Sequence, residues 1–79
     1  MRIAFHIEHF YFRGTEIAVY DYAHYNETIL GNESIIIFPI LSKYEHHFGV
    51  IDKFISRFNI YGYRDINELK KLNIDKMII

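Results

Sequence analysis

The chain has 79 residues, a formal net charge of −1 and no cysteine. This length allows one domain, and the lack of cysteine excludes disulfides, zinc ribbons and thiol catalysis. Nine Lys and Arg residues are balanced by ten Asp and Glu residues, which excludes a nucleic-acid or anionic-membrane interface that relies on bulk positive charge. The apolar fraction of 51% is enough to drive folding. Because a small domain leaves much of its surface exposed, we expect the chain to associate or to belong to a larger fold.

No stretch of the sequence contains the roughly 20 consecutive apolar residues that a membrane helix needs. The apolar segment near the N-terminus is interrupted by His6, Glu8, His9 and Arg13, so it does not have the core of a signal peptide. We therefore predict a cytoplasmic protein without a membrane span.

The first elements along the chain are predicted to be a strand and a helix. Residues 2–7 are short and apolar, which favours a buried strand. A helix is predicted over 16–30, with Thr15 as its N-cap and Glu16 in the first turn, where the helix dipole favours negative charge. Gly31 suits the left-handed position that ends a helix. The residues expected to form the apolar face of this helix are Ala18, Val19, Tyr22, Ala23, Ile29 and Leu30.

The middle of the chain repeats the pattern. Residues 34–39 form a continuous run of β-branched and aromatic residues that ends at proline, which is typical of a strand buried on both faces of a parallel sheet. An amphipathic helix follows, and residues 60–63 are a short strand. The helix is predicted from the spacing of Phe48, Ile51, Ile55 and Phe58.

The last part of the chain is predicted to be a short helix and a strand. Asp65 and Glu68 have the spacing of a capping box. The helix that they open carries Ile66, Leu69 and Leu72. Residues 74–79 then form a fourth strand.

The predicted order is β-α-β-α-β-α-β. Such alternation gives an α/β fold with a parallel sheet and right-handed crossovers, here a three-layer Rossmann-like half with a short sheet. We expect residues 1–79 to form a single, incomplete domain, because nothing follows the last strand to cover it. The excess apolar surface is expected on the strands at 35–38 and 77–79.

The junction between the first strand and the first helix is the candidate binding site, since ligands of α/β sheets bind at the carboxyl ends of the strands. Gly14 permits close approach of the backbone, the start of the helix offers free N–H groups, and Arg13 adds positive charge for a diphosphate. The alternative is that these residues only turn the chain and cap the helix. The glycine-rich fingerprints of dinucleotide-binding proteins and of P-loop NTPases are absent, which disfavours both classes.

The segments 1–7 and 12–26 together resemble the N-terminal Rossmann-like domain of GT-B glycosyltransferases. In that family a Gly-Gly-x-Glu element follows the first strand and opens the first helix, beside the sugar acceptor and the diphosphate of the nucleotide-sugar donor. Gly14, Thr15 and Glu16 match the later part of this element, whereas Arg13 stands where the first glycine is usual. The topological resemblance covers the whole chain, and the motif-specific part covers about the first half.

The resemblance implies that the chain is the N-terminal part of a GT-B-like glycosyltransferase and supplies the acceptor-side half of a sugar-transfer cleft. The substrate-binding residues would be His9, Arg13, Gly14, Thr15 and Glu16. A nucleotide-sugar donor is implied by the resemblance only, and no other cofactor is expected. Enzymes of the family need a second Rossmann-like domain, which supplies the sugar-nucleotide site with its acidic residues. Nothing in this sequence corresponds to that domain, so we expect the chain alone to be inactive. Its expected partners are a nucleotide-sugar or sugar acceptor and the missing C-terminal domain.

Two alternatives remain open. His9 and Glu16 are candidates for a general base and its partner, or are simply loop and capping residues. The five histidines lack the spacing of a helical metal-binding pair, so no metal site is predicted.

The chain as a whole is alternatively a small free-standing α/β module for interaction or for binding a phosphate or sugar ligand. Such a module would act as a homo-oligomer through the exposed edge and apolar face of its last strand.

Overall fold

The protein is described by a computed structural model that covers residues 1–8, 14–40 and 48–78, with the backbone alone at 14–16 and 48. The predicted order of strands and helices is confirmed, except that the third helix is a 3-10 helix, η1. The elements are β1 (Arg2–His6), α1 (Gly14–Thr28), β2 (Glu33–Pro39), α2 (Phe48–Ile55), β3 (Asn59–Tyr63), η1 (Ile66–Leu72) and β4 (Lys76–Ile78).

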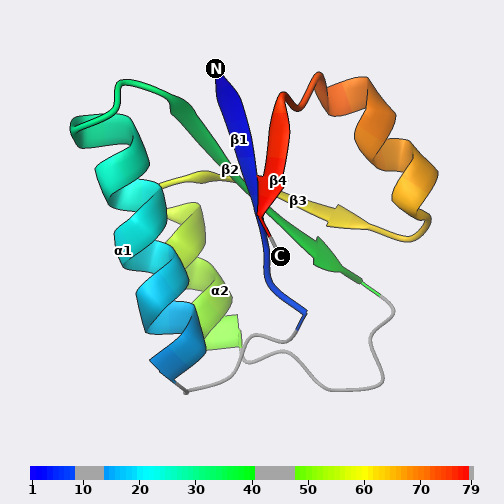
Figure 1. Cartoon of the computed structure of the whole chain (residues 1–79). Helices are drawn as coiled ribbons and strands as arrows, with labels where there is room; N and C mark the ends of the chain where they lie inside the picture. Colours follow the sequence, from blue (N-terminus) through cyan, green and yellow to red (C-terminus); the bar gives the residue numbers. More distant parts are fainter. Residues whose placement is uncertain (9–13, 41–47, 79) are drawn as a thin grey trace.

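The four strands form a parallel sheet with the order β3-β2-β1-β4. Helices α1 and α2 cover one face of the sheet and η1 covers the other, which gives three layers (Figure 1). The predicted α/β class and parallel topology are therefore confirmed. Strand β1 lies between β2 and β4, with Ala4 level with both Ile35 and Met77.

The face of the sheet under α1 and α2 carries the larger hydrophobic core. Alternate side chains of β1, including Ile3 and Phe5, pack here against Ala23 of α1 and Phe54 of α2. Ser34 is buried at the edge of this core, where its hydroxyl donates to the Ala23 carbonyl at 2.8 Å. Every second residue of a strand points to the same face, so the pattern on β1 determines which side chains reach the helices.

The opposite face holds a smaller core under η1. It consists of Ala4, Ile35, Ile37 and Leu69, with tyrosines of β3 at its margin. Leu69 is the buried residue of η1, whereas Ile66, three positions earlier, is 55% exposed. One short helix therefore covers only part of this face.

The predicted apolar face of α1 is only half correct. Ala23 is buried and Val19 is partly buried against the core, but Tyr22, Ile29 and Leu30 are exposed. Residues four apart are neighbours on a helix surface, and α1 carries apolar residues on its flank as well as on the side that meets the sheet. The sequence pattern did not separate these two sets.

The predicted apolar face of α2 is also wrong at one position. Ile55 is 53% exposed, whereas the predicted Phe58 is buried and the predicted Ile51 packs partly buried against the core. Val50 and Phe54 also enter the core. Phe58 lies just beyond the helix, where its N–H donates to the Phe54 carbonyl. The turn at the end of α2, rather than a longer helix, brings Phe58 into the core.

The ends of the helices follow the predicted signals with one exception. Gly31 has a φ of 70° and Asn73 a φ of 52°, both in the left-handed region that ends a helix. Asp65 caps η1 by accepting from the Asn67 N–H, and the Glu68 carboxylate lies 3.4 Å from the Arg64 backbone nitrogen. Helix α1 begins at Gly14, so Thr15 lies inside the first turn instead of at the N-cap.

The exposed apolar surface lies on one of the two predicted strands only. Ile35, Ile36 and Ile37 of β2 are buried, because this inner strand is covered on both faces. The side chains of β4 are all exposed, and Ile78 is exposed at 52%. In the part of the chain that the structure describes, no helix is long and apolar enough to cross a membrane.

Candidate functional site

The candidate site lies at the carboxyl ends of the strands, beside β1. The connection from β1 to β2 uses α1 on one face of the sheet, whereas the connection from β3 to β4 uses η1 on the other. The strand order therefore reverses between β1 and β4. In open α/β sheets this reversal opens the crevice in which ligands bind.

The predicted site residues follow β1 in the sequence, and the last three of them belong to α1. Gly14 is the first residue of α1, and Thr15 and Glu16 belong to its first turn. The backbone N–H groups of a first turn have no partner within the helix. The predicted roles of His9 and Arg13, and of the Thr15 and Glu16 side chains, fall outside the described residues.

The structure adds a pair of side chains that the sequence analysis did not combine. His6 at the end of β1 and Tyr63 at the end of β3 lie on the η1 side of the sheet, with Nε2 and the hydroxyl oxygen 2.6 Å apart. Either the hydroxyl donates to an unprotonated Nε2, or a protonated Nε2 donates to the hydroxyl oxygen. The His6 side chain is only 10% exposed, so the contact fixes the orientation of a nearly buried imidazole.

Glu8 adds a carboxylate to this pair. Its Oε2 lies 3.9 Å from His6 Nε2, and its own side chain is 66% exposed. Burial, followed by the charge of Glu8, raises the pKa of the Tyr63 hydroxyl above its ordinary value of 10.0. The three residues, which we call the edge cluster, thus combine a neutral phenol, an imidazole and a carboxylate that can hydrogen-bond the hydroxyl groups of a ligand.

Another histidine is part of a structural contact between the two helices. Arg57, just after α2, lies 2.6 Å from Glu27 Oε1 and 3.1 Å from His24 Nδ1, both on α1. This contact holds the C-terminal end of α1 against the end of α2. Within the residues that the structure describes, no group of three His, Cys, Asp or Glu side chains is placed to hold a metal ion.

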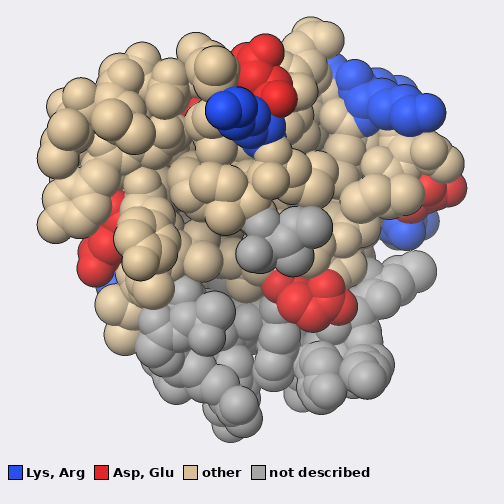
Figure 2. All heavy atoms as spheres, viewed as in Figure 1, with Lys and Arg blue, Asp and Glu red and all other residues tan. Residues whose placement is uncertain are grey.

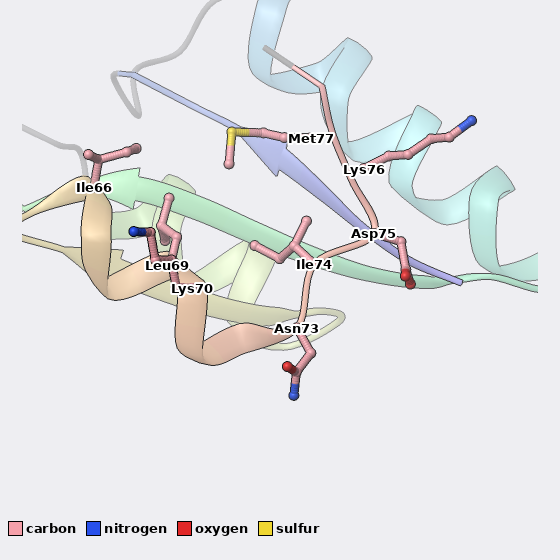
Figure 3. A pocket seen from close by; sticks show the side chains of 8 residues that line it. All are labelled: Ile66, Leu69, Lys70, Asn73, Ile74, Asp75, Lys76 and Met77. Carbon is pink, nitrogen blue, oxygen red and sulfur yellow. The ribbon is translucent and has the colours of Figure 1, made fainter.

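A groove of about 600 Å³ lies between η1 and β4, on the face away from α1 and α2. Leu69, Ile74 and Met77 point into it, whereas the polar ends of Asn73, Asp75 and Lys76 point away (Figure 3). A small-molecule site needs a few polar groups that converge on the ligand. Three of the four polar residues that line the groove point away from it, so it does not bring several polar groups together, and the edge cluster is the stronger candidate.

No local signal in the sequence would have identified the edge cluster. His6 and Tyr63 are separated by 57 positions, and they meet only because the sheet places the ends of β1 and β3 on either side of β2. What the sequence did indicate is the edge of the sheet on which a site is expected, because parallel strands end together.

Comparison with known proteins assigns no family to the chain. No protein-family model, no curated protein and no solved structure matches it. The observations therefore establish a small α/β domain whose four-stranded parallel sheet has the order β3-β2-β1-β4.

Proposed function

We propose that the chain supplies the acceptor-side half of a sugar-transfer cleft, as the N-terminal part of a GT-B-like glycosyltransferase. The main support is the coincidence of a motif and a position. The sequence Gly14-Thr15-Glu16 forms the first turn of α1, Arg13 precedes it in the sequence, and β1 borders the point at which the strand order reverses. A diphosphate or sugar hydroxyl at this junction would meet the free N–H groups of the first turn of α1.

The edge cluster gives additional support. Sugars are recognised through their hydroxyl groups, which both donate and accept hydrogen bonds. The Glu8 carboxylate accepts, and the hydroxyl of Tyr63 and the imidazole of His6 can each do either, according to protonation. The cluster lies at the end of β1, directly before the segment that contains the proposed site residues.

The experiment is a titration of the isotope-labelled chain with UDP-glucose, followed by amide NMR. We expect saturable shifts in the amides of residues 13–16, and we expect Arg13→Ala to weaken binding about tenfold by removing a charge-assisted contact. Lys70→Ala is the matched control, because it removes an exposed positive charge from η1, on the opposite side of the sheet from α1. Shifts that do not saturate, or that Arg13→Ala leaves unchanged, would contradict the proposal.

We further propose that the isolated chain does not transfer sugar. One half of a sugar-transfer cleft lacks the groups of the other half that stabilise the leaving diphosphate. The measurement is release of UDP from UDP-glucose in the presence of sugar acceptors, with no release expected. Turnover by the chain alone would show that it carries a complete active site.

A second candidate function is a free-standing α/β module that acts as a homo-oligomer. The observation in its favour is the set of exposed apolar side chains on α1 and β4. Oligomerisation and ligand binding use different parts of the molecule, so the UDP-glucose titration does not test this candidate. Measurement of the molecular mass in solution tests the homo-oligomeric module.

A further inference from the structure

Helix α1 carries an exposed apolar flank on the side away from α2. Tyr20, His24 and Glu27 of α1 contact α2 or the residues just after it. At 100° per residue, Ala18, Tyr22, Tyr25 and Ile29 lie on the opposite side of the helix. Tyr22, Tyr25 and Ile29 are 66%, 53% and 72% exposed, and the Ile29 N–H still donates to the Tyr25 carbonyl as in a continuing helix.

Strand β4 forms the edge of the sheet beyond β1, on the side away from β2 and β3, and its side chains are exposed. Lys76 is level with Ile3 and Ile78 is level with Phe5, and both of these β1 side chains point toward α1 and α2. Lys76 and Ile78 therefore point to that face too, and both are exposed. We call the flank of α1 together with Lys76 and Ile78 the shelf.

The shelf has room for one helix. Neighbouring strands lie about 4.8 Å apart and packed helices about 8–10 Å apart. Helix α1 is fixed over β1 and β2 through Ala23 and through Asn26, which hydrogen-bonds Ser34 of β2. A further helix beside α1 would therefore lie over β4. Figure 2 shows that the surface over the upper part of α1 is largely free of Lys, Arg, Asp and Glu, and that charged side chains lie over the upper end of the sheet.

We infer that the occupant of the shelf is α1 of a second copy of this chain. A two-fold axis parallel to the strands would place each α1 over β4 of the other copy, with the two flanks in contact. Each copy then contributes the same residues to the interface, as two-fold symmetry requires. The helix that fills the shelf needs an apolar flank, and α1 has one that this chain leaves exposed.

Charge complementarity supports a second copy as the occupant. Asp21 lies on the outer side of α1, pointing away from its own sheet, and is exposed. In the two-fold arrangement this outer side faces β4 of the other copy, where Lys76 is exposed. Among the described residues neither Asp21 nor Lys76 forms an ion pair within its own chain. The dimer would therefore pair each Asp21 with Lys76 of the second copy.

The available area is sufficient for a specific dimer of moderate affinity. A large side chain that is fully exposed has a solvent-accessible area of roughly 200 Å². On this basis the exposed area is roughly 500 Å² per copy for the side chains of Tyr22, Tyr25, Ile29 and Ile78. The two copies together would bury roughly 1,000 Å², which is near the lower limit for a biological interface. We therefore expect a reversible dimer whose population depends on concentration.

The experiment measures molecular mass by sedimentation across a wide range of concentration. Asp21→Lys and Lys76→Asp should each raise the dimer Kd at least about tenfold, because two-fold symmetry duplicates every charge contact. The double variant D21K/K76D restores opposite charges and should return the Kd to within about threefold of wild type. Asp52→Lys is the matched control, because it reverses an exposed charge on α2, away from the shelf.

A chain that stays monomeric at every concentration would overturn the inference. A dimer that the single reversals weaken without rescue by the double variant would overturn it as well, since its interface would lie elsewhere or have another arrangement. All these positions are exposed, so circular dichroism of each variant is expected to match wild type. The inference rests on the second candidate function, the homo-oligomeric module, and not on sugar transfer. An oligomer that the charge reversals leave unchanged would keep that function and overturn only the arrangement inferred here, and failure of the UDP-glucose titration leaves the sedimentation result unchanged.

Discussion

At the scale of single residues, the edge cluster is held by one short contact between distant parts of the chain. His6 is nearly buried, and the hydroxyl of Tyr63 supplies its Nε2 with a hydrogen-bonding partner 2.6 Å away. A buried polar group without a partner costs about 1–3 kcal/mol. The contact therefore stabilises the fold as well as orienting the imidazole toward the carboxyl edge of the sheet.

The raised pKa of Tyr63 predicts how the stability depends on pH. Because the folded state favours the protonated phenol, the unfolded chain ionises first, near the ordinary value of 10.0. The contribution of Tyr63 to stability is thus fully present below pH 10 and is lost as the pH rises through the raised pKa of the folded state. We expect the free energy of unfolding, measured with urea on either side of pH 10, to fall more steeply in wild type than in Tyr63→Phe.

The control for this prediction is Tyr61→Phe, which removes a hydroxyl from the same strand while leaving the edge cluster in place. This variant should keep the steep pH dependence of wild type. If Tyr63→Phe and Tyr61→Phe have the same pH dependence, burial and the charge of Glu8 do not raise the pKa of Tyr63 in the folded state.

At the scale of elements, each helix is fixed by a few side chains that enter the core. In α2, Phe54 is 1% exposed and packs edge-to-face against Tyr20 of α1, with ring centroids 5.4 Å apart. Its chain neighbour Ile55 is 53% exposed. Two adjacent apolar residues of one short helix thus have opposite environments.

This contrast gives a paired test of the observed helix face. Phe54→Ala should lower the free energy of unfolding by about 3–5 kcal/mol, because it removes a buried ring and leaves a cavity. Ile55→Ala changes an exposed side chain and should stay within about 0.5 kcal/mol of wild type. Urea denaturation measures both. Comparable losses in the two variants would indicate that α2 is rotated relative to the described structure.

At the scale of the whole molecule, the sheet is covered unequally. Two helices cover one face over β1, β2 and β3, and one 3-10 helix covers part of the other, so β4 remains exposed on both faces (Figure 1). The N–H and C=O groups along the free edge of β4 also face outward, as in any edge strand. A chain with this distribution gains stability from any partner that binds the folded state.

We therefore expect the melting temperature to rise with protein concentration. If folding is coupled to dimerisation through the shelf, mass action stabilises the folded state as the concentration increases. The measurement is thermal unfolding by circular dichroism at several concentrations, and the effect should be reduced in Asp21→Lys. A melting temperature that does not change with concentration would indicate that the monomer accounts for all of the observed stability.

The sequence was informative wherever the signal is local. The isoleucine run before Pro39 predicted a buried inner strand, Gly31 predicted the left-handed end of α1, and Asp65 predicted the cap of η1. Each of these depends on neighbours within a few positions. The alternation of strands and helices likewise predicted a parallel sheet, because a chain that passes through a helix between strands re-enters the sheet in the same direction.

The sequence was less informative wherever the outcome depends on which surfaces meet. Helix α1 has apolar residues around much of its circumference, so its periodicity alone did not separate Ala23, which meets the sheet, from Tyr22, which is exposed. In α2, the periodicity likewise predicted that Ile55 faces the core, whereas the buried residue is Phe54. A helical pattern identifies apolar positions, but only the packing partner determines which of them are buried.

By itself, the sequence determined the α/β class, the order of the elements, the excess of apolar surface for a chain of 79 residues and the edge of the sheet on which a ligand is expected. Only the tertiary structure decided that, besides the predicted last strand, this excess lies on α1 and not on β2, and that His6 meets Tyr63. The physical reason is how far apart in the sequence the interacting residues lie. Strands, caps and turns depend on contacts between near neighbours, whereas the shelf and the edge cluster arise from residues that the order of the strands brings together across the chain.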